Sequence, residues 1–334
     1  MEEVSERRLK DVCIEVLKDR LGLVVKRCSI KRLDGISNRT YSLTVVDEQG
    51  KTRKFSIKIY EGTRRSAQKK LVKEQYVTYL LRAFGVHAPR IIHADPEGSL
   101  IGKPLMIRTW VHAKEADKLL DKVELSSKIV EVLVETLVKI HRIPLDIIDN
   151  AKLSIPKSSL DYIESQITLI RILGRILKLP VEGLVRWLKG NVPSKMRLAL
   201  LHGDYSPGNV LIDKDLKSHL VDLESFEIGI PASDVCYAYH FLAIHENLNR
   251  RVRGLANIFI RHYRRYLPLT YDEFRYWRVL SAAKLLLFIK YLETSRMLLR
   301  KGPLFYPVVK MFLIRPAIKY LSRVIFTTTS IKIL

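Results

Sequence analysis

The stretch HGDYSPGNVLID, residues 202–213, places two polar side chains in a segment too rich in Gly and Pro to be a helix. Asp204 and Asn209 stand five residues apart, and Pro207 and Gly208 between them narrow the conformations of the loop. A carboxylate on a rigid loop can accept the proton of an attacking hydroxyl, and an amide oxygen is a hard ligand suited to Mg²⁺. The pattern therefore predicts acid–base and cation-binding chemistry in this loop.

Three further polar residues stand at the joints of predicted elements. Asp222 follows the second of two short strands, NVLID and SHLVDLE, which the DKDLK turn joins. Lys58 lies on a strand over residues 54–60, in which apolar and polar residues alternate with a period of two. Glu74 comes sixteen residues later, in the middle of a helix predicted over 64–84. A second carboxylate, a lysine and a helical glutamate are thus available to the same chemistry.

The first third of the chain predicts a small antiparallel sheet crossed by one helix. The turn DGISN, with Gly35, Ser37 and Asn38, joins the first two strands. Strands are expected at 24–33, 39–47 and 54–60, and in the segments RIIHA and PLMIRTWV. Beyond residue 112 the pattern is mostly helical, with helices expected at 127–143, 159–178, 181–189, 232–246, 251–267, 271–300 and 304–324. We therefore predict a small lobe at 1–111, a helical lobe at 112–300 and a C-terminal extension at 301–334.

Composition indicates a folded cytoplasmic protein of two lobes. The chain has 334 residues, of which 47% are hydrophobic and 28% are charged. Its cysteines, Cys13, Cys28 and Cys236, lie far apart without a CxxC pair, which fits a reducing compartment. The N-terminal segment has the pattern of an amphipathic helix with acidic residues, not that of a signal peptide. The most apolar stretch, VLSAAKLLLFIKYL, is interrupted by two lysines and is too short for a membrane span.

Charge is distributed unevenly. The formal net charge is +23, and residues 247–334 hold 18 basic residues against three acidic ones. Such a field concentrates anions and repels cations. In the run RRVRGLANIFIRHYRRYL, basic and aromatic residues are interleaved, as in surfaces that bind phosphates and stack bases, and we expect Arg261, Arg264 and Arg265 to bind an anionic partner. The basic, apolar segment 303–324 suits a membrane interface, although packing on the helical lobe is the more common arrangement.

At these points the chain resembles the aminoglycoside phosphotransferase and choline kinase family. The resemblance is carried by the HGD loop with PGN after it, by the apolar strand that ends at Asp222, and by GIPASD at 229–234. It covers roughly residues 30–245. It implies an α+β, two-lobed protein-kinase-like fold, with a small antiparallel-sheet N-lobe and a mostly helical C-lobe.

The resemblance also implies an ATP- and Mg²⁺-dependent phosphotransferase (a kinase) that acts on a hydroxyl. Phosphoryl transfer needs in-line positioning and neutralisation of the phosphate oxygens. Asp204 would accept the hydroxyl proton, Asn209 and Asp222 would hold Mg²⁺, and Lys58 would reach the phosphates from a position set by Glu74. The turn residues Gly35, Ser37 and Asn38 would contact the nucleotide.

The charge favours an anionic acceptor over an aminoglycoside. A polycationic antibiotic needs acidic residues around it, and residues 247–300 offer three among many arginines. RNA is mildly favoured, because an extended polyanion exploits a broad basic surface. Two alternatives remain open: a kinase of a small molecule such as a sugar, sugar phosphate or lipid headgroup, and a non-catalytic nucleic-acid-binding pseudokinase. Retention of Lys58, Asp204, Asn209 and Asp222 speaks against the pseudokinase.

Overall fold

The computed structural model describes residues 5–33, 38–249, 251–295 and 314–334. The chain divides into two compact units, which we call the small lobe and the helical lobe. The small lobe comprises residues 1–113 together with 219–224, and the helical lobe comprises 114–218 and 225–334. The short segment 219–224 therefore returns to the small lobe from the middle of the helical part of the chain.

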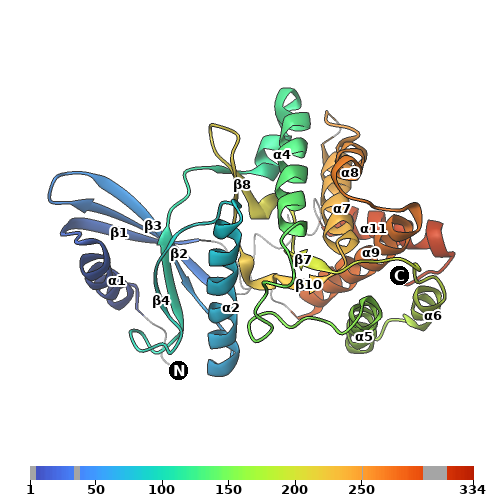
Figure 1. The fold of residues 1–334 in the computed structure, drawn as a ribbon, viewed down its shortest axis with the longest axis horizontal. Helices are drawn as coiled ribbons and strands as arrows, with labels where there is room; N and C mark the ends of the chain where they lie inside the picture. Colours follow the sequence, from blue (N-terminus) through green and yellow to red (C-terminus); the bar gives the residue numbers. More distant parts are fainter. Residues whose placement is uncertain (1–4, 34–37, 250, 296–313) are drawn as a thin grey trace. The chain divides into compact units, whose positions relative to one another are not determined.

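The small lobe contains a five-stranded antiparallel sheet in the order β1-β2-β3-β5-β4 (Figure 1). Its strands are β1 (Val25–Leu33), β2 (Arg39–Asp47), β3 (Thr52–Ile59), β4 (Ile91–Asp95) and β5 (Leu105–Thr109), and its helices are α1 (Glu6–Leu21) and α2 (Arg64–Ala83). These bounds confirm the predicted sheet and the single helix that accompanies it between β3 and β4.

Alternation along β3 gives the two faces of the sheet different partners. Ile57 and Ile59 belong to a buried cluster that includes Leu9 and Leu17 of α1. The opposite face supplies Met106 of β5, which packs with Tyr60, Ala67 and Leu71 in a second cluster at α2. Because side chains of a strand alternate between the two faces, the residue between the two isoleucines is turned toward the α2 side.

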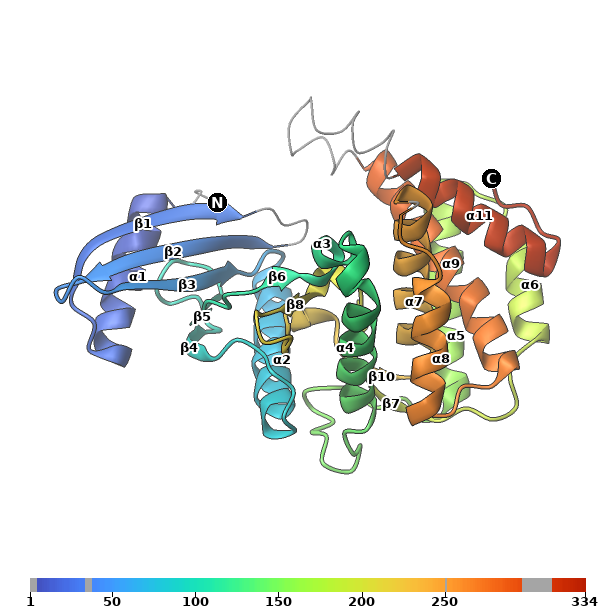
Figure 2. The same ribbon diagram turned by 90° about the horizontal axis from the view of Figure 1, so that it is seen from above.

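The helical lobe is built from helices around short strands (Figure 2). Its helices are α3 (Ala116–Leu120), α4 (Val123–His141), α5 (Ser159–Leu177), α6 (Glu182–Gly190), α7 (Ala232–Leu248), α8 (Leu255–Tyr266), α9 (Tyr271–Thr294) and α11 (Arg315–Thr329). Its short elements are β6 (Lys114–Glu115), β7 (Ala199–Leu201), η1 (Pro207–Asn209), β8 (Val210–Ile212) and β10 (Glu227–Gly229). Two more, β9 (Ser218–Leu220) and η2 (Leu223–Ser225), lie mostly in the 219–224 segment of the small lobe. β7 pairs with β10, so that Leu201 lies opposite Glu227.

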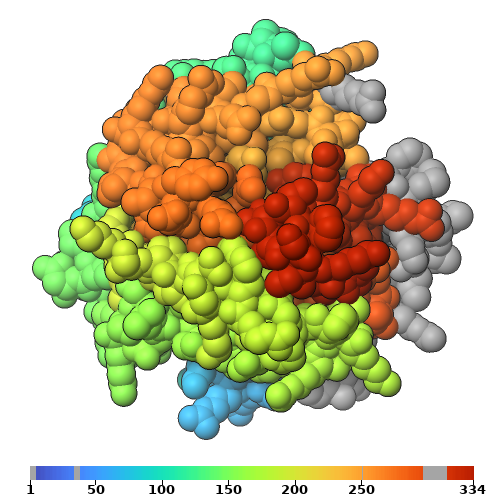
Figure 3. Space-filling model, turned by 90° about the vertical axis from the view of Figure 1, so that its right-hand side faces the viewer, coloured from blue at the N-terminus to red at the C-terminus, as the bar shows by residue number. Residues whose placement is uncertain are grey.

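The described end of the predicted extension packs on the helical lobe. Ala317, Leu321 and Ile325 of α11 are buried, and the Tyr320 hydroxyl lies 3.1 Å from Nδ1 of His240. Figure 3 shows this C-terminal part in red between the orange α8–α9 segment and the yellow-green α5–α6 segment. The first part of the predicted membrane-interface segment, 303–313, lies outside the described residues. In the part of the chain that the structure describes, no helix has the length and apolar character to cross a membrane.

Candidate active site

Lys58 is the centre of a charged cluster inside the small lobe. Its Nζ atom lies 2.9 Å from Oε2 of Glu74, 2.8 Å from Oδ1 of Asp222 and 3.6 Å from Oε2 of Glu224. The side chains of Lys58 and Glu74 are 5% and 0% exposed, whereas that of Asp222 is 43% exposed. The lysine therefore joins a fully buried carboxylate to one that solvent and ligands can reach.

Local periodicity explains why Lys58 and Glu74 meet. Lys58 stands between Ile57 and Ile59 and pairs with Met106 of β5, on the face that packs against α2. Glu74 lies on the buried side of α2, one turn after Leu71. The strand period thus directs the lysine toward the helix, and the helix period directs the glutamate toward the sheet. The ion pair predicted from the sequence is present.

Glu74 has two further partners, which the sequence did not reveal. Nη1 of Arg108 lies 2.6 Å from its Oε1 atom, and the Tyr60 hydroxyl donates to its Oε2 atom at 2.7 Å. Burial alone would raise the pKa of Glu74, but Lys58 and Arg108 together lower it to about 2. Arg108 lies on the same face of β5 as Met106, two residues earlier. This alternation is the sequence signal that could have placed Arg108 beside Glu74.

Asp222 reaches the cluster through an unusual backbone conformation. Its φ of 57° lies in the left-handed region, which a short polar residue such as Asp tolerates better than most. The Leu220 amide donates to the His87 carbonyl at 2.8 Å, which ties the 219–224 segment to the small lobe. Nδ2 of Asn38 donates to Oε2 of Glu224 at 2.5 Å. Gly35 and Ser37, predicted to contact the nucleotide, lie outside the described residues.

In the helical lobe, Asp234 holds the backbone of the HGD loop. Its carboxylate accepts hydrogen bonds from the amides of His202 and Gly203, at 2.7 and 3.0 Å, and it is 1% exposed. Gly203 has φ 79°, and a Cβ atom there would lie 2.2 Å from the Ser225 carbonyl oxygen. Only glycine satisfies both the conformation and the close approach, so the loop that presents Asp204 is fixed by its backbone.

Asn209 bonds to Asp204. Nδ2 of Asn209 donates to the backbone oxygen of Asp204 at 2.8 Å and to Oδ2 at 3.0 Å. Because the nitrogen of Asn209 makes the loop contacts, its amide oxygen is the atom that can bind a cation. The predicted pair Asp204 and Asn209 is therefore a bonded unit. Burial, and then the negative charge of Asp204, raise the pKa of the Tyr237 hydroxyl on α7 well above its ordinary value.

Two histidines support the loop from within the lobe. Nδ1 of His141 lies 2.8 Å from the Tyr263 hydroxyl, and its Nε2 lies 3.4 Å from Asp234. Burial lowers the pKa of His141 although Asp234 raises it, so the neutral ring can accept from Tyr263 and donate to Asp234. His202 is fully buried beside Phe226, with ring centroids 4.8 Å apart.

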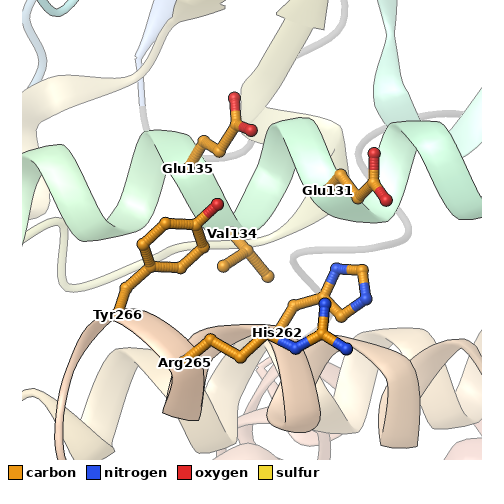
Figure 4. A pocket seen from close by; sticks show the side chains of 6 residues that line it. All are labelled: Glu131, Val134, Glu135, His262, Arg265 and Tyr266. Atoms are coloured by element: carbon orange, nitrogen blue, oxygen red, sulfur yellow. The ribbon is translucent and has the colours of Figure 1, made fainter.

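The α8 arginines have different surroundings. Arg265 lines a pocket of about 200 Å³ between α4 and α8 (Figure 4). The other residues of its lining are Glu131, Val134, Glu135, His262 and Tyr266. The Arg264 guanidinium lies 5.8 Å from the centroid of the Phe274 ring, and Arg261 is exposed. Arg265 therefore shares its pocket with two glutamates, whose negative charge reduces the attraction it can offer an anion.

The predicted residues fall into two groups. Lys58, Glu74 and Asp222 meet in the small lobe, and Asp204 and Asn209 meet in the helical lobe. Among the described residues no set of three or more His, Cys, Asp or Glu side chains could hold a metal ion. The available donors are the oxygens of Asp222 and Asn209. Each is a hard oxygen donor of the kind that Mg²⁺ prefers.

Comparison with known proteins identifies the class. Residues 29–275 match the model of the phosphotransferase enzyme family, and the chain belongs to that family. It is therefore a phosphotransferase enzyme, as the HGD loop and its partners indicated. The predicted two-lobed protein-kinase-like fold is confirmed, and the matched residues include all of Lys58, Glu74, Asp204, Asn209 and Asp222.

Particular proteins are similar at low identity. A candidate aminoglycoside phosphotransferase of Ralstonia eutropha JMP134 superposes with a TM-score of 0.72 at 15% identity, over 96% of this chain and 97% of that one. An amicoumacin kinase solved with AMP-PNP, Ca²⁺ and amicoumacin superposes with a TM-score of 0.56 at 14% identity, over 94% of this chain and 96% of that one. Acyl-CoA dehydrogenase family member 10 of Mus musculus is 26% identical to this chain over 61% of the chain's length. The match spans only about a fifth (19%) of the length of the mouse protein.

Proposed function

We propose that this chain transfers the γ-phosphoryl group of ATP to a hydroxyl of an anionic small molecule, with Mg²⁺ as cofactor. The observation that carries the proposal is the position of Lys58 between the buried Glu74 and the accessible Asp222. A buried lysine aligned by one carboxylate and placed beside a second is suited to phosphates whose charge a divalent cation shares.

The small lobe supplies the phosphate contacts. Glu74, with a pKa of about 2, stays ionised at neutral pH and holds the Lys58 ammonium in one position. Lys58 would bind phosphate oxygens as a point charge. Asp222, whose side chain is 43% exposed, would be a ligand of Mg²⁺ together with the amide oxygen of Asn209. When bound, the cation would neutralise the phosphate oxygens during transfer.

The helical lobe supplies the base. Asp204 would accept the proton of the acceptor hydroxyl as its oxygen attacks the γ-phosphorus and the bond to the leaving ADP breaks. Its loop needs little reorganisation, because Asp234 fixes the backbone and Asn209 fixes the carboxylate. Rigid support of this kind is what a positioning mechanism requires.

Charge guides the choice of acceptor. The net charge of +23 favours an anion, and a sugar phosphate carries both the hydroxyl and the charge. The amicoumacin kinase, which is similar in fold, is named for a small-molecule substrate and supports acceptors of that size.

RNA is the second candidate, favoured by one observation. Arg261, Arg264 and the 45% exposed Tyr266 lie on α8 and could contact phosphates and bases. The two carboxylates beside Arg265 weaken this surface as a site for a polyanion.

The test is transfer of radioactive γ-phosphate from ATP into a cell extract separated into small-molecule and RNA fractions. Wild-type protein is compared with Asp204→Asn. Label that enters the small-molecule fraction only with the wild type supports the proposal, and label confined to RNA selects the second candidate. Absence of any transferred label from an extract rich in hydroxyl compounds would overturn the proposed activity.

A further inference from the structure

The guanidinium of Arg108 is buried in the small lobe and is paired with a carboxylate that already has another cation. The Arg108 side chain is 7% exposed, and its Nη1 atom lies 2.6 Å from Oε1 of Glu74. The other oxygen of the same carboxylate, Oε2, lies 2.9 Å from Nζ of Lys58. Two buried positive charges therefore share one buried negative charge, and the group of three side chains has one positive charge in excess.

Stability does not explain the second cation. Without Arg108, Glu74 would still be paired with Lys58, and the Tyr60 hydroxyl would still donate to its Oε2 atom at 2.7 Å. Removing a guanidinium from water is costly, and well-packed apolar side chains in place of buried ionic groups are often as stable. Nε of Arg108 is also buried and has no hydrogen-bond partner among the described residues, which adds to the cost. A buried cation of this kind indicates a role in function.

We infer that Arg108 is a positioning residue for nucleotide binding, which holds one oxygen of Glu74 so that the charge of Lys58 stays available to phosphates. The inference rests on the proposed function of Lys58 as the phosphate contact. It assigns a role to a residue of β5 that the sequence pattern did not single out.

The occupied oxygen of Glu74 determines how Lys58 is held. A lysine ammonium has three N–H donors. One donates to Oε2 of Glu74 at 2.9 Å and one to Oδ1 of Asp222 at 2.8 Å, whereas Oε2 of Glu224 is further away, at 3.6 Å. The third donor is therefore available to a phosphate oxygen. If Arg108 were absent, Oε1 of Glu74 would be free to turn toward the ammonium and compete for that donor.

The charge of Arg108 acts in the same direction as its hydrogen bond. A lysine that is neutralised by its own buried glutamate offers a distant phosphate little attraction. Two cations on the carboxylate of Glu74 keep a positive charge in a part of the lobe where water screens it little. Asp222, whose side chain is 43% exposed, and Glu224 are the acidic groups that face this charge.

The test compares the binding of AMP-PNP and of adenosine in the presence of Mg²⁺, measured by isothermal titration calorimetry. Adenosine has the base and the ribose but no phosphate, so the ratio of the two dissociation constants isolates the phosphate contacts. Arg108→Gln keeps a donor at this position and removes the charge, whereas Arg108→Lys keeps the charge. Arg82→Met is the matched control, because it removes one positive charge from an exposed position near the end of α2.

Arg108→Gln should raise the Kd for AMP-PNP about tenfold and leave that for adenosine unchanged, as for a unit charge acting across about 10 Å in a medium of intermediate dielectric constant. Arg108→Lys should recover most of the affinity for AMP-PNP, and Arg82→Met should keep the wild-type ratio. If Arg108→Gln does not fold, Arg108→Met replaces it with the same expectation, because its apolar side chain suits the buried position.

Weaker binding of both ligands by the same factor would show a merely structural role for Arg108 and would overturn the inference. An unchanged ratio in Arg108→Gln, beside a wild type that binds AMP-PNP more tightly than adenosine, would overturn the inference and leave the proposed function of Lys58 standing. A wild type that binds the two ligands equally well would overturn the proposed phosphate contact itself, and the role of Arg108 with it.

Discussion

The Nζ atom of Lys58 lies 2.8 Å from the Oδ1 atom of Asp222, which is 164 positions further along the chain. The contact exists because the segment 219–224 belongs to the small lobe although the chain on both sides of it belongs to the helical lobe. The residue proposed to bind phosphates and a residue proposed to bind Mg²⁺ are therefore held by one lobe.

Lys58→Ala should weaken the response to ATP and slow turnover together. Glu74 keeps its bonds to Arg108 and Tyr60 in this variant, so the lobe should remain folded. We expect kcat/KM for ATP to fall by about 10²-fold or more, as when a single charge-stabilising contact to the transition state is removed. Steady-state kinetics measure this, with Lys54→Ala on the same strand as the control. Equal losses of kcat/KM in Lys58→Ala and Lys54→Ala would contradict the proposal that Lys58 binds the phosphates.

Glu74 should make the stability of the small lobe sensitive to acid. Its folded-state pKa of about 2 lies below the ordinary 4.5, so its stabilisation is present above pH 4.5 and is lost as pH falls toward 2. The difference corresponds to about 3 kcal/mol. Glu74→Gln should lose a comparable amount at pH 7, because the buried Arg108 would lose its carboxylate partner and Lys58 would lose the buried one of its three. Urea unfolding from pH 7 to 3 tests this, and a variant with wild-type stability at pH 7 would refute it.

Asp204→Asn should leave folding and nucleotide binding nearly intact while lowering turnover by about 10²–10⁴-fold, the usual contribution of a positioned base. Asp222→Ala should instead abolish Mg²⁺-dependent nucleotide binding. Calorimetry with ATP and Mg²⁺, together with the labelling assay, separates the two effects. The exposed Asp215→Asn is the matched control near this loop. Full activity of Asp204→Asn would show that another group takes the proton.

Gly203→Ala should destabilise the helical lobe. An alanine there would have to keep φ 79° and place its Cβ atom 2.2 Å from the Ser225 carbonyl. We expect a loss of about 2 kcal/mol or more in the free energy of unfolding, because the loop or the end of η2 must shift. Gly190→Ala is the control, since a Cβ atom at Gly190 would meet nothing within 4 Å. Denaturant titration of both variants measures this difference, and similar unfolding midpoints for the two would disprove the steric argument.

Whether the arginines of α8 bind RNA can be tested separately. If RNA is the acceptor, Arg261→Glu with Arg264→Glu should weaken it and lower the salt dependence, since log K falls by about 0.7 per phosphate contact per decade of salt. ATP binding should be unchanged. Filter binding over a salt series measures this, with the exposed Arg186→Glu of α6 as the control. Binding that is equally weak for all three proteins would remove RNA from consideration.

The sequence by itself determined the elements and the direction of several side chains. Alternation in 54–60 placed Lys58 opposite the apolar core face, and helical spacing in 64–84 placed Glu74 in the middle of a helix, whose buried side the structure shows it to occupy. The Gly and Pro residues of 202–209 predicted a rigid loop, which the structure contains. These properties are local, because they depend on the period of a strand or a helix and on the few conformations open to Gly and Pro. The family followed from the same residues.

Of the short strands, β8 and β9 were predicted, whereas β6, β7 and β10 were not. β7 and β10 have three residues each and β6 has two, which is too few for a period to be recognised. The last helix was expected at 304–324, whereas α11 runs over Arg315–Thr329, and residues 304–313 of that range lie outside the described part.

Only the tertiary structure decided the partners. Arg108 and Tyr60 join Glu74, and the 219–224 segment brings Asp222 to Lys58. Each contact unites residues on different elements, and its geometry depends on how strands pair and helices pack. A buried charge is stable only where all its partners converge. Local patterns place a side chain on a face, and the packing of the whole lobe determines what it meets there.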